Sequence, residues 1–388
     1  MGEAYVTGIG STDYSRDSGR GPTVLAVQAI RAALDDAGLA AAQVDGMAVF
    51  GAESAGATAV ASALGLGRLG FMAADAPGGG SAAGVLGLAR LAVSAGLARV
   101  VVAYRALNAS SGRRFGRPDP AAVTGGDGGR ARAGGAGVVG GEFSGPYGLL
   151  VPAHVFALMA EAWLGPGGNR DELEAGLRAV AVRQRAFAAR TPGALLGSSP
   201  LSADDHSRSP RVAGPLRRAD LCLESDGACA VVVTGACAVT AASPVRIAAA
   251  AQWADAGYEH LFLRGPLPPR PPEGAVAGLL ARAGLTAAGL DLLGTHDSTS
   301  FNVILDAESV GLCPPGGGAR WAIAPDVTCN PSGGMLAEAY GQGMNTLVEL
   351  VRQLRGTAGN QRPGCRAALL TGPAVNSAAL LVGEGPSA

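Results

Sequence analysis

One segment of the chain occurs twice, near opposite ends of the sequence. Residues 37–45 read AGLAAAQVD, and residues 283–291 read AGLTAAGLD. Each copy closes an alanine-rich stretch with helical periodicity, and each leads through a short link into an apolar stretch that is typical of a strand. A single repeat at this distance predicts two similar α/β halves rather than a solenoid, which would show many short periods. We therefore expect the functional site where the two halves meet.

Composition limits the class of protein that this chain can form. Its 388 residues are 48% hydrophobic and 16% charged, which is enough apolar material for one large core or two medium ones. A net charge of −1 without a basic run gives no electrostatic reason for nucleic-acid binding. No apolar run approaches the ~18 residues that a membrane-spanning helix needs, and the first residues do not resemble a signal peptide. The expectation is a soluble globular protein of the cytoplasm.

Cysteine and lysine usage restricts the available chemistry. The chain contains no lysine, and all 30 of its basic residues are arginine, so a lysine Schiff base and a P-loop lysine are excluded. Histidines and carboxylates show no metal-ligand spacing, and we expect neither a metal nor another cofactor. The cysteines form neither a CxxC pair nor a disulfide framework, which predicts reduced thiols. They are Cys222, Cys229, Cys237, Cys313, Cys329 and Cys365.

Apolar periodicity predicts helices and strands that alternate along both halves. Strands are expected at residues 5–9, 46–50, 99–104, 227–234 and 292–295, and in a closing pair around Gly372, and the second half is expected to begin at Val245. Helices are expected at residues 23–37, 59–64, 81–95, 152–164, 170–189, 301–310 and 340–354. The Gly/Arg-rich residues 113–139 and residues 198–211 predict loops.

Two glycine-rich motifs need separate interpretations. Residues 65–70 match the dinucleotide pattern GxGxxG, yet they follow a helix and no suitable acidic residue stands about 20 positions on, so we interpret them as a connecting loop. Gly78, Gly79 and Gly80 precede a predicted helix, where free N–H groups can hold an anion or oxyanion, although close helix–sheet packing explains them equally well. Ser81, which follows them, has no base nearby in the sequence, and we do not interpret it as a nucleophile.

The polar segment after the second copy of the repeated strand is the main candidate site. His296 and Asp297 stand at the carboxyl end of that strand, where open α/β sheets place their sites. Residues 330–334, Asn-Pro-Ser-Gly-Gly, form a predicted sharp turn that can direct Asn330 and backbone amides into the same crevice. The alternative interpretation is a capped helix start and a structural turn. The other histidines are interpreted as structural, namely His154, His206 and His260.

Several short segments form an ordered pattern along nearly the whole chain. They are residues 7–15, 102–106, 111–116, 145–148, 225–228, 296–297, 330–334, 338–340 and 343–345. Together they are specific, although each alone is weak. The pattern resembles the thiolase superfamily in its lipid-transfer-protein branch, and most of all the bacterial steroid side-chain retro-aldolases.

The resemblance implies a fold, an assembly and a ligand. The fold is a duplicated thiolase fold, with two α/β halves in five layers (αβαβα) and an inserted loop domain. The N-terminal half then comprises residues 1–112 and 216–244, the loop domain residues 113–215, and the C-terminal half residues 245–388. A CoA thioester binds between the halves of this family. The resemblance also implies a homodimer that pairs edge strands of the first halves, and a small zinc-ribbon/OB-fold partner protein.

The chain departs from ordinary thiolases at the positions of the residues that form and resolve their covalent acyl-enzyme. Gly79 stands where thiolases carry the nucleophilic cysteine, Tyr340 stands where they carry the histidine that activates it, and no second cysteine lies near Gly372. A covalent acyl-enzyme of the thiolase kind is therefore excluded. Tyr340 matches the retro-aldolase pattern, but those aldolases have a tyrosine where this chain has His296 and a histidine where it has Gln342.

The resemblance and the chemistry of these residues predict retro-aldol cleavage of a β-hydroxyacyl-CoA. We expect Tyr340 to take the β-hydroxyl proton, His296 to donate to the thioester oxygen, and Asn330 to orient water or the same oxygen. Backbone amides are expected to line the oxyanion site at Gly79, Gly80 and Gly372. Supporting roles are expected for Asp297, Tyr104 and Arg105.

Other functions stay open at this point. One is a different C–C or C–O reaction on an acyl thioester, such as a condensation in natural-product biosynthesis. Another is a non-catalytic thiolase-fold subunit that binds acyl-CoA and supports a partner. A plain thiolase is disfavoured because the catalytic cysteines are absent from their expected positions.

Overall fold

The computed structural model describes residues 2–51, 53–75, 81–112, 114–117, 145–236, 243–253 and 267–383. Several positions that the sequence singles out lie outside these ranges, namely Gly78, Gly79, Gly80, Cys237, His260 and residues 118–139. Within the described chain, no helix is both long and apolar enough to cross a membrane.

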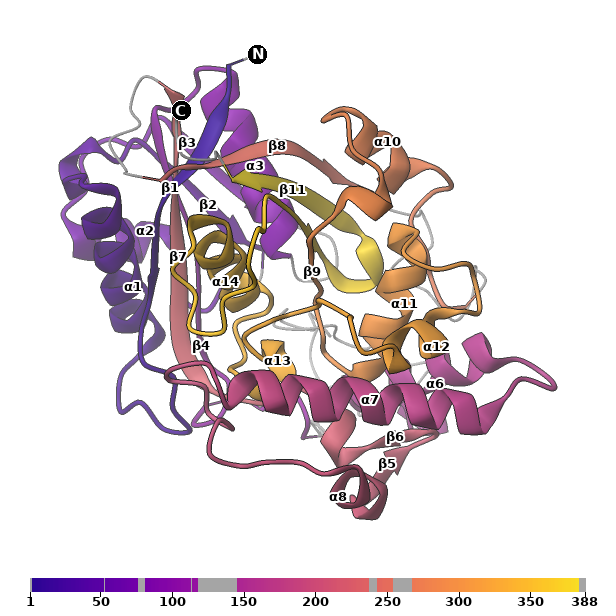
Figure 1. Cartoon of the computed structure of the whole chain (residues 1–388). Helices are drawn as coiled ribbons and strands as arrows, with labels where there is room; N and C mark the ends of the chain where they lie inside the picture. Colours follow the sequence, from indigo (N-terminus) through magenta and orange to yellow (C-terminus); the bar gives the residue numbers. More distant parts are fainter. Residues whose placement is uncertain are drawn as a thin grey trace.

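A nine-stranded sheet runs through the molecule. Its strands are β1 (Ala4–Ser11), β2 (Gly46–Phe50), β3 (Phe71–Asp75), β4 (Val100–Asn108), β7 (Asp226–Gly235), β8 (Val245–Gln252), β9 (Leu292–Gly294), β10 (Ala367–Thr371) and β11 (Ser377–Gly383). They follow the order β3-β2-β4-β7-β1-β8-β11-β10-β9 (Figure 1). The N-terminal half supplies the strands up to β1, and the C-terminal half supplies the rest. The halves join where Tyr5 and Val6 of β1 pair with Arg246 and Val245 of β8.

Helices cover the outer faces of both halves and fill the space between them. They are α1 (Pro22–Ala37), α2 (Ala57–Leu64), α3 (Ala82–Ser94), α10 (Ala275–Ala281), α11 (Ser300–Val310), α12 (Gly318–Ile323), α13 (Gly334–Ala337) and α14 (Met344–Arg355). Helices α1 and α2 pack outside the first half, and α10 and α11 pack outside the second. Helices α3 and α14 share one apolar core between the halves. This arrangement gives five layers and confirms the predicted fold class.

The repeated sequence forms the same structure in both halves, which confirms the predicted duplication. Helix α1 stops at Gly38 and α10 is followed by Gly284, and both glycines adopt left-handed φ values, 66° and 70°. A short 3-10 turn, η1 (Ala41–Gln43) or η7 (Ala287–Gly289), then leads into β2 or β9. Strand β2 pairs parallel with β3, and β9 forms a parallel bridge with Cys329 at the equivalent place.

An inserted segment lies between β4 and β7 in the sequence and below the sheet in Figure 1. Its described elements are η3 (Gly145–Tyr147), α6 (Pro152–Leu164), α7 (Arg170–Ala188), α8 (Ala203–Arg208), β5 (Arg211–Ala213), β6 (Leu216–Arg217) and η4 (Arg218–Asp220). Apolar side chains of α6 and α7 pack against α11 and α12 of the C-terminal half. The insertion is thus anchored to the second half, although it interrupts the first. The domain limits given above stay a prediction.

The structure corrects several local predictions. Residues 198–211, predicted as a loop, contain helix α8, and neither β3 nor α12 was predicted. The helix predicted from Tyr340 begins only at Met344, because Gln342 and Gly343 adopt left-handed φ values of 49° and 88°. The GxGxxG segment connects α2 to β3, in agreement with the sequence-based interpretation.

Candidate active site

A pocket of about 980 Å³ lies between the inserted segment and the polar loops of the C-terminal half. This volume is at the upper end of the ~300–1,000 Å³ that is usual for ligand sites. Tyr340, Gln342 and His296 line it, and they are respectively 8%, 5% and 6% exposed. Residues 114–117, which follow β4, form another part of the wall. Tyr340 and His296, which the sequence analysis selected, therefore face one cavity.

Tyr340 lies in an irregular turn between α13 and α14. Its backbone N–H donates to Ser225 Oγ at 2.8 Å, and its phenol oxygen accepts a hydrogen bond from Gln342 Nε2 at 3.3 Å. Gln342 and Gly343 hold left-handed backbone conformations, which delay the start of α14. The turn therefore presents the side chains of Tyr340 and Gln342 to the pocket instead of continuing the helix.

The environment of Tyr340 keeps its phenol protonated. Burial raises the pKa of Tyr340 well above its ordinary value, and the nearby Cys222 thiol adds to the rise. The hydrogen bond from Gln342 and the positive charge of Arg105 act in the opposite direction. The ring of Phe115 lies 5.5 Å from the ring of Tyr340, centroid to centroid, with a tilt of 50°. Tyr340 is thus a neutral hydroxyl group at neutral pH.

His296 follows β9, at the carboxyl end of that strand. Burial lowers the pKa of its imidazole from 6.5 to about 4, so the ring is neutral at neutral pH. Its Nδ1 is buried and has no hydrogen-bond partner among the described residues. A buried polar atom without a partner carries a free-energy cost that a bound ligand can remove. His296 thus lines the pocket as a neutral ring with one nitrogen that no described residue binds.

Asp297 points away from the pocket and anchors the neighbouring turn. Its carboxylate accepts N–H groups from Met335 at 2.9 Å and from Leu336 at 3.4 Å. Burial raises its pKa to about 7, and the bond from Met335 is the largest opposing effect. Gly334 packs so closely that an added Cβ would lie 2.2 Å from an Asp297 oxygen. The predicted supporting role is consistent with this geometry, since Asp297 ties the segment before Tyr340 to the segment that carries His296.

Asn330 does not face the pocket, which corrects its predicted place beside the substrate. Its Oδ1 accepts the Thr295 N–H at 2.8 Å, and its Nδ2 donates to the carbonyl oxygen and the hydroxyl of Thr295, each at 3.2 Å. The amide is fully buried, with both ends bound to one neighbour. Asn330 therefore joins two site loops, and it reaches the chemistry only through their positions.

Three further expected site residues lie outside the pocket wall. The Gly372 N–H donates to the carbonyl oxygen of Ser377 at 2.9 Å, so this amide is not an open oxyanion donor as predicted. Tyr104 donates its hydroxyl to the Ala55 carbonyl at 2.5 Å within the core. Arg105 forms a buried ion pair with Glu53 at 3.2 Å and can influence the site through its charge alone. Gly79 and Gly80 lie outside the described residues.

Residues 222–225 connect the parts of the site, and the sequence analysis did not identify this role. The Cys222 N–H donates to Ser298 O, and the Leu223 N–H donates to Met335 O, each at 2.9 Å. Glu224 binds the segment at 114–117, and Ser225 binds the turn at Tyr340. These partners are far apart in the sequence, so no local pattern predicts the contacts. The only signal for residues 222–225 was that residues 225–228 belong to the family pattern.

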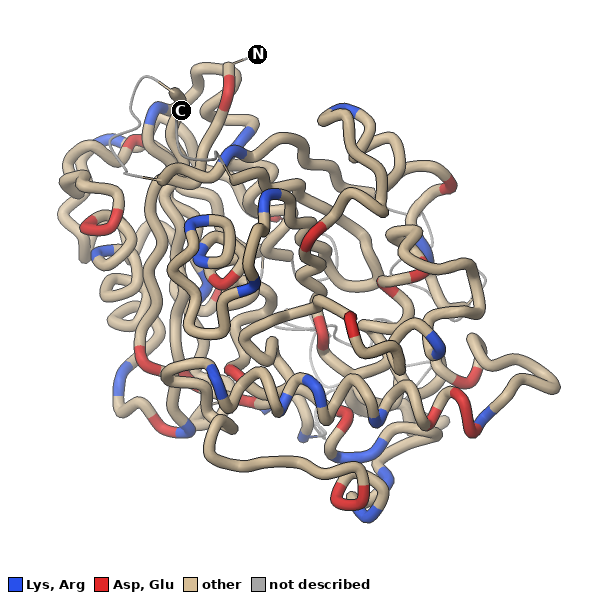
Figure 2. Tube along the Cα trace, in the orientation of Figure 1, with Lys and Arg blue, Asp and Glu red and all other residues tan. Residues whose placement is uncertain are grey.

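Arginine side chains dominate the charged lining of the pocket. They are Arg16, Arg114, Arg117, Arg185, Arg208 and Arg218, beside the acids Asp205 and Glu224. Arg114 pairs with Glu224 and Arg208 pairs with Asp205. In the described parts of the chain, Arg16, Arg117 and Arg218 form no ion pair. Along α7, the acidic residues lie together near the start of the helix and most of the arginines lie toward its end, as Figure 2 shows.

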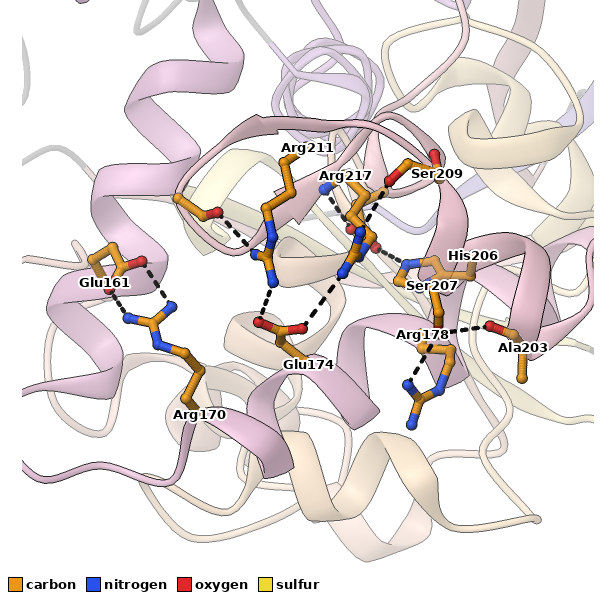
Figure 3. Close-up of polar contacts among 12 residues, drawn as sticks. Glu161, Arg170, Glu174, Arg178, Ala203, His206, Ser207, Ser209, Arg211 and Arg217 are labelled. Atoms are coloured by element: carbon orange, nitrogen blue, oxygen red, sulfur yellow. Dashed lines mark hydrogen bonds and ion pairs between the residues drawn. The ribbon is translucent and has the colours of Figure 1, made fainter.

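Polar contacts hold the inserted segment in the shape that forms one side of the pocket (Figure 3). Glu174 of α7 accepts Arg211 at 2.7 Å and lies 3.8 Å from Arg217, on the short β5–β6 hairpin. His206 of α8 contacts buried Asp220 at 2.8 Å. His154 accepts the Leu150 N–H. The structural interpretation of His154 and His206 is therefore supported.

The fold and the site together define a class of protein, the thiolase fold, here with a pocket between the inserted segment and the C-terminal half. Residues 272–382 match the family described as Thiolase C-terminal domain-like. The chain is 36% identical to the 17-hydroxy-3-oxo-4-pregnene-20-carboxyl-CoA lyase of Mycobacterium tuberculosis, over 98% of this chain and 99% of that protein. It is 35% identical to the steroid side-chain-cleaving aldolase of Thermomonospora curvata, over 98% of each.

A solved structure gives the same result. The Ltp2-ChsH2(DUF35) aldolase superimposes with a TM-score of 0.86 at 32% identity, over 98% of each chain. The chain therefore belongs to the thiolase superfamily, in the group of the steroid side-chain retro-aldolases.

Proposed function

We propose that this protein is a carbon–carbon lyase that cleaves a β-hydroxyacyl-CoA with a steroid or similar lipid acyl group. The observation that carries the proposal is the convergence of Tyr340, His296 and Gln342 on one buried pocket. Two relatives that match over their full length are named as an acyl-CoA lyase and a side-chain-cleaving aldolase, which supports the same reaction class.

In the proposed reaction, the neutral phenol of Tyr340 relays a proton: its oxygen accepts the proton of the β-hydroxyl group as the Cα–Cβ bond breaks, and its own proton passes to Cα. The carbon that carried the hydroxyl becomes the carbonyl carbon of a ketone or aldehyde, and the electron pair of the broken bond passes into a thioester enolate. His296 donates a hydrogen bond to the thioester oxygen, and a proton added at Cα releases the shortened acyl-CoA. Because the phenol and the imidazole both start neutral, both proton transfers at Tyr340 are coupled to the breaking of the C–C bond.

The arginines of the pocket suit the CoA portion of this substrate. Guanidinium groups bind phosphate oxygens through paired, charge-assisted hydrogen bonds. Arg16, Arg117 and Arg218 line the pocket and have no ion-pair partner in the described chain, so they are free to bind phosphate. We assign the CoA phosphates to this group of side chains, and no metal or other cofactor is part of the proposal.

We further propose a homodimer that associates with a small DUF35-type partner in the cytoplasm. Strand β3 is a free edge of the sheet, and Met72 on it is 50% exposed, which suits pairing with a second copy. The structural relative is described as an Ltp2-ChsH2(DUF35) assembly, which supports a partner of that kind. Light scattering tests the dimer, and a monomer at micromolar concentration would contradict it.

The reaction is tested by incubating the protein with candidate β-hydroxyacyl-CoAs, with and without the small partner protein from the same organism. The expected result is a released ketone or aldehyde together with an acyl-CoA shortened by the same carbons. Binding of the thioester without any carbonyl product, over a panel of steroid and aliphatic acyl groups, would contradict the proposal and favour a non-catalytic subunit.

A further inference from the structure

The segment at residues 114–117 is fastened to the site by a single carboxylate. Glu224 Oε2 accepts Arg114 Nε at 2.5 Å, and Glu224 Oε1 accepts the backbone N–H of Gly116 at 2.8 Å. The two contacts lie on either side of Phe115. The Glu224 side chain is 13% exposed, so both hydrogen bonds are partly shielded from water. Glu224 thus holds the backbone directly after Phe115 and the side chain directly before it, which restrains the residue between the two bonds.

Phe115 is the side chain that this attachment orients. Its ring lies 5.5 Å from the ring of Tyr340, and it packs in a small apolar cluster with Tyr340, Met335 and Cys222. Phe115, Glu224 and Tyr340 all line the pocket. Phe115 therefore forms the wall beside the phenol, where it limits both the rotation of the Tyr340 ring and the access of water to it.

We propose that Glu224 is a positioning residue, which holds Phe115 against Tyr340 and thereby fixes the orientation of the phenol and the shape of the adjoining acyl-binding wall. This inference rests on the proposed function for its kinetic consequences, although the attachment itself is a property of the folded chain. Glu224 acts through Phe115 and takes no proton from the substrate. Its neighbour Ser225 holds the backbone of Tyr340 from the other side, so residues 224 and 225 fix the ring and the backbone of the same tyrosine.

The kinetic test is a double-mutant cycle between Glu224 and Phe115. Glu224→Ala is expected to lower kcat about tenfold with a smaller change in KM, because the base is misaligned rather than the substrate lost. Glu224→Gln keeps an acceptor for Gly116 and loses the charge that Arg114 contacts, so an intermediate loss is expected. In a Phe115→Ala background, Glu224→Ala should cause no further loss. A full additional loss there would overturn the proposal, since Glu224 would then act without Phe115.

Limited trypsin digestion tests the attachment without any turnover. Trypsin can cut after Arg114, whereas the bond after Arg117 precedes proline in the sequence and resists cleavage. Glu224→Ala should increase the rate of cleavage after Arg114 about fivefold or more, because the local opening becomes easier. The matched control is Glu161→Gln, which removes an ion pair with Arg170 (2.6 Å, Figure 3) away from the pocket and should leave cleavage and turnover unchanged.

These two readouts separate the inference from the proposed function. If the wild-type protein cleaves no β-hydroxyacyl-CoA, the proposed function fails, while faster trypsin cleavage of Glu224→Ala still supports the attachment. An unchanged cleavage rate after Arg114 overturns the attachment whatever the turnover. Thermal unfolding followed by circular dichroism shows whether each variant is folded, and Glu224→Gln is used for the digestion if Glu224→Ala is not.

Discussion

The two halves of the molecule share one strand order but begin their central helices differently. In the N-terminal half, the order from the outer edge is β3-β2-β4-β7-β1, and in the C-terminal half a bridge at Cys329 precedes β9-β10-β11-β8. Helix α3 starts at Ser81, whose Oγ accepts the Gly84 N–H at 2.9 Å. Helix α14 begins at Met344 after its N-cap residue Gly343, which has no side chain to cap it.

The two helix starts differ in how far the protein itself binds their polar groups. At the start of α3 the polar groups of Ser81 are paired: its N–H donates to Asp75 at 2.6 Å, and its hydroxyl contacts Ser377 at 2.6 Å. The turn before α14 leaves Gln342 Oε1 without a partner in the described chain. Ser81 is thus engaged within the protein, whereas Gln342 lines the pocket with one polar atom that no described residue binds.

Buried polar side chains follow the same division. Fully or nearly buried carboxylate, amide and imidazole groups of the C-terminal half include His296, Asp297, Asn302, Asp306, Asn330, Glu338, Gln342, Asn345 and Glu349. Burying such groups has a cost that hydrogen bonds offset only in part. The C-terminal half thus contains the proposed reactive groups and many of the buried polar groups around them, and four substitutions test this proposal.

The largest effect is expected from Tyr340→Phe. Removing the hydroxyl removes the proposed base, so turnover should fall by ~10²–10⁴-fold while the ring keeps its contact with Phe115. Steady-state kinetics on a β-hydroxyacyl-CoA, together with thioester binding measured by calorimetry, check this prediction. Unchanged turnover would exclude Tyr340 from the mechanism, and loss of the fold would show that its role is structural.

His296→Ala should rank second. The proposed bond to the thioester oxygen forms mainly in the transition state, so kcat should fall by ~10²–10³-fold with little change in KM. His296→Tyr, which introduces the residue of the resembling aldolases, should keep part of the activity. A rise in KM alone would show that His296 binds substrate and transition state equally.

A pH-dependent effect is expected from Glu349→Gln on α14. Burial raises the pKa of Glu349 from 4.5 to about 7. Between these values the folded protein holds a proton that the unfolded chain has lost, so this group's contribution to stability decreases as pH rises through that window. From pH 4.5 to 7 the wild-type free energy of unfolding should fall by ~2–3 kcal/mol relative to the variant. Urea unfolding at several pH values measures this, and a constant difference would contradict it.

The smallest effect is expected from Ser81→Ala in the N-terminal half. The substitution removes the cap of α3 and the contact with Ser377, and should lower the free energy of unfolding by ~1 kcal/mol. Turnover at saturating substrate should change less than ~threefold, because Ser81 does not line the pocket. A large fall in kcat at unchanged stability would show that the first half also contributes to the chemistry.

Local sequence patterns were sufficient to predict the framework of this protein. The repeat at residues 37–45 and 283–291 predicted two halves, because glycines with left-handed φ and apolar strands leave clear signals in both copies. His296 was found from its place after a strand, and Tyr340 from the family pattern. Helix α8 was not predicted, because its short sequence is polar and has no apolar periodicity.

The contacts within the site could not be predicted in the same way. Asn330 binds Thr295, 35 positions away, and Glu224 binds Arg114, 110 positions away. No sequence period reports such pairs, because they arise only when distant loops meet. The sequence therefore predicted that Asn330 contacts the substrate, whereas in the structure its side chain binds Thr295.

The central claim is that this chain breaks a C–C bond with residues of its C-terminal half and without an acyl-enzyme. The most direct test quenches the reaction of the protein and its small partner with a β-hydroxyacyl-CoA at successive times, and measures protein and products by mass spectrometry. We predict equal amounts of the carbonyl compound and the shortened acyl-CoA, with the protein mass unchanged throughout. An acyl adduct on the protein, or shortened acyl-CoA that forms only when free CoA is added, would contradict the account.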